Sequence, residues 1–129
     1  MTLELWILVA MGVFLIVLGL MPGIAKLQEF KLLQTGNYQR DDLPPLSGWG
    51  ARAERALYNL YESLPLFTIL ILAAHLTNAN NDMTALGAEL FLLGRILHPV
   101  FYIFGPGLMR SVAWAIATSG MVLVGLQLG

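Results

Sequence analysis

The sequence contains no cysteine and little charge. Without cysteine, the chain has neither a disulfide framework nor a thiol nucleophile of its own. Charged residues make up 12% of the 129 residues, about half the share of a typical soluble domain, whereas 57% are hydrophobic. The formal net charge is −1 and no basic patch with interleaved aromatic residues is present, so nucleic-acid binding is excluded. This composition favours one small domain in a membrane.

Four apolar stretches are each long enough to cross a bilayer as a helix. The first carries no charge, and the residues before it (Met-Thr-Leu-Glu) lack the positive segment of a signal peptide, so we interpret it as a retained helix. We predict an all-α membrane protein whose single domain, residues 1–129, is an up-down bundle of four transmembrane helices. The predicted spans are approximately residues 5–25, 51–77, 83–104 and 109–128.

Local patterns refine these spans. Leu27, Phe30 and Leu33 stand at helical spacing just beyond the first span, which predicts that the first helix continues past it. Pro65 lies inside the second span and Pro99 inside the third. Membrane helices tolerate proline when neighbouring groups satisfy the freed carbonyl, so we expect helices that continue with a local kink.

The basic residues are distributed unevenly. All seven lysines and arginines lie in the first loop and its flanking helix ends, in the third span, or in the turn before the fourth. The N-terminus, the polar turn at residues 77–82 and the C-terminus have none. Because cytoplasmic loops carry an excess of lysine and arginine, both termini are predicted to face away from the cytoplasm. We expect a multi-pass protein of a bacterial inner membrane or a eukaryotic endomembrane.

Polar side chains recur on one face of the second span, at spacings of three, four and three residues. They fall within an arc of about 80° on a helix. An ionised group near the middle of a bilayer costs at least about 2.5–3.5 kcal/mol unless it is paired or hydrated. This face is therefore expected to meet a partner helix or a bound ligand. Its residues are Arg52, Arg55, Asn59 and Glu62.

The third span adds a matching set, Arg95, His98 and Tyr102, again on one helix face. One interpretation is structural: Glu62 pairs with Arg95, and the other groups form interhelical hydrogen bonds that fix the packing. The other is a polar pocket of net positive charge that opens toward the cytoplasmic side. Such a pocket suits a small anionic ligand that also carries an ammonium group.

Other titratable residues of the spans are assigned no role in a site. Glu89 is interpreted as a member of a structural pair, with a place in a trimer interface as the alternative. Metal binding by His75 and His98 is not expected, since these residues belong to different helices and lie at different depths. We therefore predict no metal site.

The second span resembles the signature of the MAPEG family, the membrane-associated proteins in eicosanoid and glutathione metabolism. The matching run is Arg52-x-x-Arg55-Ala-x-x-Asn59-x-x-Glu62-x-x-Pro65-x-Phe67. The third span and the start of the fourth resemble the prostaglandin E synthase branch of the same family. The matching residues there are Gly94-Arg95-Ile-Leu-His98-Pro-Val-Phe-Tyr102 and Arg110-Ser111-Val112.

This resemblance implies a homotrimer of four-helix subunits with a glutathione site between neighbouring subunits, near the cytoplasmic face. The implied function is a glutathione-dependent membrane transferase or peroxidase that acts on lipophilic electrophiles arriving through the bilayer. Arg110 would stand beside the sulfur as the catalytic cation, with Ser111 as a second stabiliser. Glutathione, as co-substrate, would be held by Arg52, Arg55, Asn59, Glu62, Arg95, His98 and Tyr102.

The chain departs from the family pattern in places. Ser63 replaces an aromatic residue of the leukotriene branch, Trp114 replaces a tyrosine of the prostaglandin branch, and the basic residue at the end of the first helix matches Lys26 only loosely. Two other function classes stay open. One is a non-catalytic protein of this fold, whose polar face serves trimer assembly or binds another small anion. The other is a small transporter, which the uncharged course of the first and fourth spans disfavours.

Overall fold

The described part of the chain, residues 1–37 and 39–129 of a computed structural model, contains helices and no strand. Four of the helices, all but the short α2, are long and apolar enough to cross a membrane. The prediction of an all-α protein with four membrane-spanning helices is therefore confirmed. The helices are α1 (Leu3–Glu29), α2 (Leu32–Thr35), α3 (Gly48–Leu76), α4 (Asp82–Phe104) and α5 (Gly107–Leu126).

The first helix ends sooner than its pattern suggested. α1 stops at Glu29, and Lys31 adopts a left-handed backbone with a φ of 50°, which an α-helix does not accommodate. The single turn of α2 follows and ends at Gly36, where a φ of 70° costs glycine little. The predicted continuation of the first helix past residue 25 is confirmed as far as Glu29. It is wrong for Leu33, which belongs to the separate helix α2.

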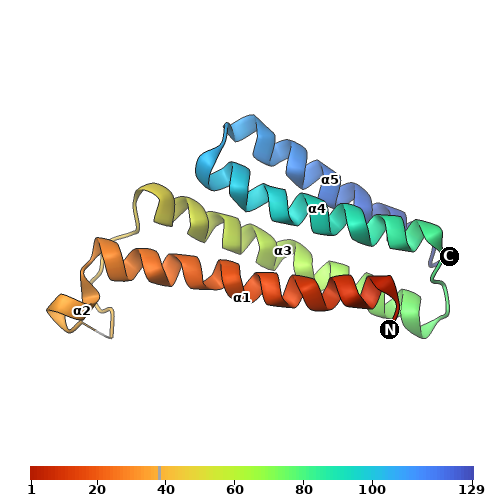
Figure 1. Cartoon of the computed structure of the whole chain (residues 1–129), viewed down its shortest axis with the longest axis horizontal. Helices are drawn as coiled ribbons and strands as arrows, with labels where there is room; N and C mark the ends of the chain where they lie inside the picture. Colours follow the sequence, from red (N-terminus) through yellow and green to blue (C-terminus); the bar gives the residue numbers. More distant parts are fainter. Residues whose placement is uncertain (38) are drawn as a thin grey trace.

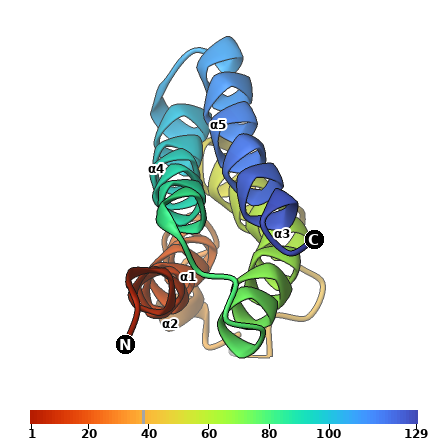
Figure 2. The same ribbon diagram turned by 90° about the vertical axis from the view of Figure 1, so that its right-hand side faces the viewer.

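The four long helices alternate in direction, so both termini lie at the same end of the bundle (Figure 1). This end, which also holds the turn between α3 and α4, is called the terminal end below. The opposite end holds α2 with the connection that follows it and the turn between α4 and α5, and is called the loop end. α4 packs against α1, α3 and α5, whereas α1 and α5 make no contact in the described part (Figure 2).

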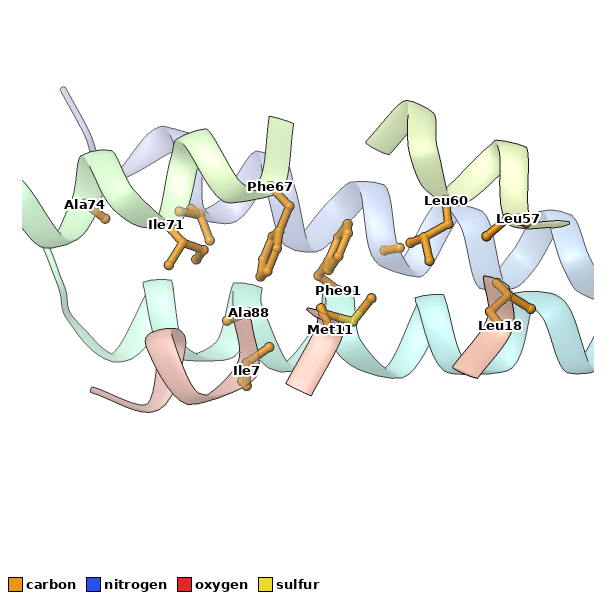
Figure 3. Packing of buried hydrophobic residues seen from close by; sticks show 12 residues of the cluster. Ile7, Met11, Leu18, Leu57, Leu60, Phe67, Ile71, Ala74, Ala88 and Phe91 are labelled. Carbon is orange, nitrogen blue, oxygen red and sulfur yellow. The ribbon is translucent and has the colours of Figure 1, made fainter. Parts of the chain in front are cut away.

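Apolar side chains fill the middle of the bundle. The rings of Phe67 on α3 and Phe91 on α4 stack with their centres 3.9 Å apart. Met11, Leu60 and Ile71 are fully buried in the same cluster (Figure 3). Many other large apolar side chains point outward, which suits helices surrounded by lipid. On α1 these outward-facing residues include Trp6, Val13, Ile16 and Leu20.

Small residues determine the contact between α4 and α5. A Cβ built on Gly94 would lie 2.6 Å from the carbonyl oxygen of Ala113 and from the backbone nitrogen of Ala117. Gly87 and Gly120 approach each other's backbones in the same way. Small residues allow membrane helices to pack backbone against backbone. This glycine contact fixes the rotation of α5 about its axis, and thereby which of its side chains flank α4.

Proline interrupts none of the helices that contain it. α3 continues through Pro65 and α4 through Pro99, and α1 likewise contains Pro22. Membrane helices keep their course at proline when neighbouring groups satisfy the carbonyl that loses its partner. The predicted continuity of both helices is confirmed, and the kinks expected at these positions stay predictions.

Side-chain bonds join α1 to α3 at the loop end. Glu29, the last residue of α1, accepts hydrogen bonds from both the backbone N–H and the hydroxyl of Ser47, which precedes α3. Lys26 Nζ lies 3.7 Å from a carboxylate oxygen of Glu54 on α3. The basic residue at the end of the first helix is thus engaged in an ion pair with α3.

Polar groups at the terminal end satisfy one another. Glu4 of α1 is 4% exposed and accepts a hydrogen bond of 2.5 Å from the hydroxyl of Thr84 on α4. The side-chain oxygen of Asn81 caps α4 by accepting from the N–H groups of Met83 and Thr84. Its amide nitrogen donates to Gln127 Oε1, just beyond α5, over 2.8 Å. These bonds connect α1, α4 and the end of α5.

Candidate functional site

An open pocket of about 310 Å³ lies between α3, α4 and α5, toward the loop end of the bundle. Small-molecule sites in proteins begin at about 300 Å³, so the space suits a small ligand. All but one of the lining residues had been predicted as site residues. The lining consists of Asn59 from α3, His98 and Tyr102 from α4, and Arg110, Ser111 and Trp114 from α5.

The start of α5 presents its three lining residues together. Ala113 and Ala117 face α4 in the glycine contact, so Arg110 and Trp114, four residues apart, lie along one flank of the helix. Ser111 is about 60° round the axis from Trp114. Arg110 also belongs to the first turn of α5, where the helix dipole adds a partial positive charge.

Tyr102 on α4 brings two arginines to one place. The Nε of Arg55 donates to the Tyr102 hydroxyl over 3.2 Å. The guanidinium carbon of Arg110 lies 4.4 Å from the centre of the Tyr102 ring, and that of Arg55 lies 5.7 Å from it. Cations are attracted to the faces of aromatic rings, so these contacts favour the observed positions. A cation from α3 and one from α5 therefore meet beside the pocket.

Arg95 is 1% exposed and bonds to α3 from within the bundle. Its Nη1 donates to Asn59 Oδ1 over 2.8 Å. No ion pair joins Arg95 to Glu62 among residues 1–37 and 39–129, and Glu62 lies on an exposed part of α3. The ion pair of the structural interpretation is thus not formed in the described part of the chain, and Asn59 is the partner of Arg95 instead. The bond uses the oxygen of Asn59, so its amide nitrogen is the group left to donate into the pocket.

Two nitrogens near the pocket are buried without a partner. His98 is 3% exposed and borders the pocket, and its Nδ1 has no hydrogen-bond partner in the described part of the chain. The same is true of Arg95 Nε. Leaving a buried polar group unsatisfied costs about 1–3 kcal/mol. Two such groups together indicate a site that a ligand or water completes.

This combination of four spanning helices and a polar pocket agrees with the family resemblance seen in the sequence. The model of the MAPEG family matches residues 4–129, which is nearly the whole chain. The chain belongs to the MAPEG family. Comparison with curated proteins and with solved structures gave no match. The family resemblance is thereby confirmed over the first and fourth helices as well as over the two that carry the motifs.

Four of the predicted site residues of this MAPEG chain lie outside the pocket lining. Two of them hydrogen-bond to a lining residue: Arg55 donates to Tyr102, and Arg95 donates to Asn59. The Nε of Arg52 donates to the carbonyl oxygen of Ile103 over 3.0 Å, which joins the start of α3 to the end of α4. The fourth is Glu62, whose exposed position on α3 is described above.

Trp114 is the lining residue that the sequence did not assign to the MAPEG site. In the sequence, this residue is distinguished only as a departure from the family pattern. Its position four residues after Arg110 and three after Ser111 was the available signal, since residues at these spacings are neighbours on a helix surface. The indole is 48% exposed, so it borders the pocket on one side and the outside of the bundle on the other.

The remaining titratable residues of the MAPEG chain lie apart from the pocket. His75 is near the end of α3 at the terminal end, and His98 is near the end of α4 at the loop end. Within the described ranges, no three His, Asp or Glu side chains gather as a metal site requires. Glu89 is exposed on α4 and has no ion-pair partner in the described part, so the structural pair expected for it is not formed within one chain.

Proposed function

We propose that the pocket binds glutathione as a co-substrate, and that the protein is a glutathione-dependent membrane transferase or peroxidase acting on lipophilic electrophiles. The observation that carries this proposal is the meeting of Arg55 and Arg110 at Tyr102, beside polar groups that the chain leaves without partners. Membership of the MAPEG family supports it.

The chemistry of the lining suits the polar ends of the tripeptide. Glutathione carries two carboxylates and one ammonium group, and guanidinium groups bind carboxylates through charge-assisted hydrogen bonds. Arg55, the amide nitrogen of Asn59 and the Tyr102 hydroxyl are the donors on α3 and α4. Glu62, about one turn beyond Asn59, is the carboxylate available to the ammonium group. Arg95 supports the site by holding Asn59.

The start of α5 provides the groups for the sulfur. Because the chain has no cysteine, a thiol nucleophile must be the ligand's own, and free thiols titrate near about 8.5. Arg110 beside the sulfur, together with the partial positive charge of the helix start, favours the thiolate. Ser111 donates a hydrogen bond to the sulfur as the second stabiliser. The thiolate then attacks an electrophile that enters from the bilayer.

Calorimetric titration of the detergent-purified protein with glutathione tests binding directly. We expect saturable binding to the wild type, and at least about tenfold weaker binding to Arg55→Ala, since a charge-assisted contact to a carboxylate is worth about 1.5–3 kcal/mol. Arg40→Ala, on the exposed connection before α3, is the matched control and should bind normally. No heat of binding to the wild type would contradict the proposal. Equally tight binding of a tricarboxylate without a thiol would favour the non-catalytic anion-binding protein.

We also propose that the protein is a homotrimer. Glu62 on α3 and Glu89 on α4 are exposed within spanning helices and have no ion-pair partner in the described part of the chain. An ionised group facing lipid costs at least about 2.5–3.5 kcal/mol, and a neighbouring subunit provides polar surroundings instead. Native mass spectrometry from detergent micelles should show three copies. A monomer at the same concentration would contradict this proposal.

The proposed orientation places both termini away from the cytoplasm. Both termini lie at the terminal end (Figure 1). The last turn of α1, the connection from α1 to α3 and the start of α5 form the loop end, and they hold Lys26, Lys31, Arg40 and Arg110. The positive-inside rule then puts the loop end on the cytoplasmic side. C-terminal fusions to alkaline phosphatase and to green fluorescent protein report the side directly. A fluorescent C-terminus without phosphatase activity would contradict the orientation.

A further inference from the structure

A second open pocket, of about 340 Å³, lies at the loop end, between the last turn of α1 and the first turn of α3. It shares no lining residue with the pocket between α3, α4 and α5. Ala25 of α1 and Gly50 of α3 form its buried wall, where the two helices are so close that a Cβ on Gly50 would lie 2.5 Å from that of Ala25. The polar and aromatic side chains of the lining are Gln28, Glu29, Ser47 and Trp49.

The polar atoms of this second pocket are mainly hydrogen-bond acceptors around one carboxylate. Glu29 is held in place by Ser47, whose backbone N–H and hydroxyl both donate to it. These bonds leave the charge in place, since Glu29 has no ion-pair partner in the described part of the chain. An ionised carboxylate has about four lone-pair sites, so it accepts further bonds, and the side-chain oxygens of Gln28 and Ser47 are additional acceptors.

Trp49 adds an aromatic side chain to the same lining, and its indole is half-buried. The face of an indole attracts cations more strongly than other aromatic rings do. A carboxylate, further acceptors and an indole therefore match an ammonium group. A primary ammonium has three N–H donors for these acceptors, whereas a quaternary ammonium has none, so the lining favours the primary one.

The second pocket lies at the depth of lipid headgroups. The uncharged run of residues 5–25 in α1 covers about 30 Å, which is the thickness of the hydrocarbon core of a bilayer. Glu29 follows Ala25 by four residues, about 6 Å, and the headgroup layer is about 5–8 Å thick on each side. Tryptophan is enriched at the same boundary. An ammonium group at this depth belongs to a lipid headgroup.

We propose that the second pocket binds the ethanolamine headgroup of a phospholipid, with its ammonium group between Glu29 and Trp49. The ammonium neutralises the carboxylate and donates its N–H groups to the acceptors of the lining, while the indole covers its remaining face. The headgroup thereby links α1 to the start of α3, at the point where Ser47 already holds Glu29. This binding requires neither glutathione nor the pocket between α3, α4 and α5.

Lipids that differ only in the methylation of the amine test the proposal on the wild type. The delipidated protein in detergent is titrated with dioleoyl phosphatidylethanolamine, its N-methyl and N,N-dimethyl derivatives, and dioleoyl phosphatidylcholine, and native mass spectrometry measures the bound lipid. Affinity should fall at each step, to a total of about tenfold or more, because each methyl group removes an N–H donor to a charged acceptor. Equal affinities, or tighter binding of dioleoyl phosphatidylglycerol, which has no ammonium, would overturn the proposal.

Glu29→Gln removes the charge of the second pocket and should bring the affinities for phosphatidylethanolamine and phosphatidylcholine within about threefold of each other. Asp42→Asn removes an exposed carboxylate from the same connection, outside the pocket lining, and is the matched control. The control should keep the preference of the wild type. An undiminished preference in Glu29→Gln would overturn the assignment of the carboxylate.

Trp49→Leu should weaken the binding of phosphatidylethanolamine about two- to fivefold, and Trp49→Phe should recover part of the loss. Trp6→Leu removes an exposed tryptophan near the other end of α1 and should bind normally. Because Trp49→Leu retains the bonds between Glu29 and Ser47, it tests the pocket even if Glu29→Gln does not fold. Wild-type affinity in Trp49→Leu would overturn the role of the indole.

Discussion

The terminal end and the loop end of the bundle are built from similar polar side chains, yet they use these side chains differently. At the terminal end, Glu4 accepts a hydrogen bond from Thr84, and Asn81 donates one to Gln127, so donors and acceptors from different parts of the bundle match. At the loop end, His98 is buried against a pocket with Nδ1 unpartnered in the described part. Polar groups that hydrogen-bond to each other hold the helices together, whereas buried polar groups without a partner are available to a ligand.

The contrast is one of degree. Three side-chain nitrogens are buried without a partner in residues 1–37 and 39–129. Two of them, Arg95 Nε and His98 Nδ1, belong to the loop-end site, and the third, Asn80 Nδ2, belongs to the turn at the terminal end. What separates the two ends most clearly is therefore the open pocket of the loop end, which the exposed Arg110 helps to line.

The largest effect should come from removing the cation at the loop end. Arg110→Ala should lower kcat about a hundredfold or more, the usual consequence of losing one group that stabilises developing or resident negative charge. The ultraviolet absorbance band of the thiolate, measured with glutathione at neutral pH, should disappear in Arg110→Ala and weaken in Ser111→Ala while binding persists. Arg40→Ala is the control. A thiolate band unchanged by Arg110→Ala would contradict the role of Arg110 in stabilising the thiolate, and with it the catalytic role assigned to the loop end.

A change at the glycine contact should affect the loop end through the position of α5. The methyl group of Gly94→Ala would meet the backbone at Ala113 and Ala117, and overpacking of this kind costs about 1–3 kcal/mol. We expect a lower midpoint of thermal unfolding in detergent and weaker glutathione binding. Gly12→Ala on α1, where nothing lies within 4 Å of the added carbon, should have little effect. Equal effects of the two substitutions would contradict the role of the contact.

A change at the terminal end should lower stability and spare the site. Thr84→Val removes the hydroxyl that donates to Glu4 and leaves a buried carboxylate without that bond, which costs about 1–3 kcal/mol. Thermal unfolding should shift, while the affinity for glutathione should stay within about twofold of wild type. Thr77→Val, at an exposed hydroxyl that bonds only to its own helix, is the matched control. A large loss of affinity in Thr84→Val would show that the two ends are coupled.

The smallest effect should appear in double-mutant cycles within the site. Asn59→Ala and Arg95→Gln should show a coupling energy of about 1 kcal/mol in the free energy of unfolding, because their side chains share a hydrogen bond. Glu62→Gln and Arg95→Gln should couple less strongly than that pair, since no ion pair joins the two side chains in the described part of the chain. Strong coupling between Glu62 and Arg95 would restore the ion pair that the structure does not contain.

Local pattern predicted the fold well and the contacts less well. The four spans followed from run length, since a backbone in lipid must satisfy its own hydrogen bonds and forms helices where the apolar run is long enough. Helical spacing also brought His98 and Tyr102 to one face, as observed. The same spacing failed beyond Glu29, because Lys31 takes a left-handed backbone that periodicity does not reveal.

By itself, the sequence determined the number of spanning helices, the residues that share each polar face, and the family. Which face of each helix packs against which neighbouring helix was decided only by the tertiary structure. Asn59 rather than Glu62 bonds Arg95, and Trp114 joins the pocket, because the packing of α3 and α5 on α4 places them there. That packing depends on close approach at Gly94, between helices whose rotation about their own axes no local pattern specifies.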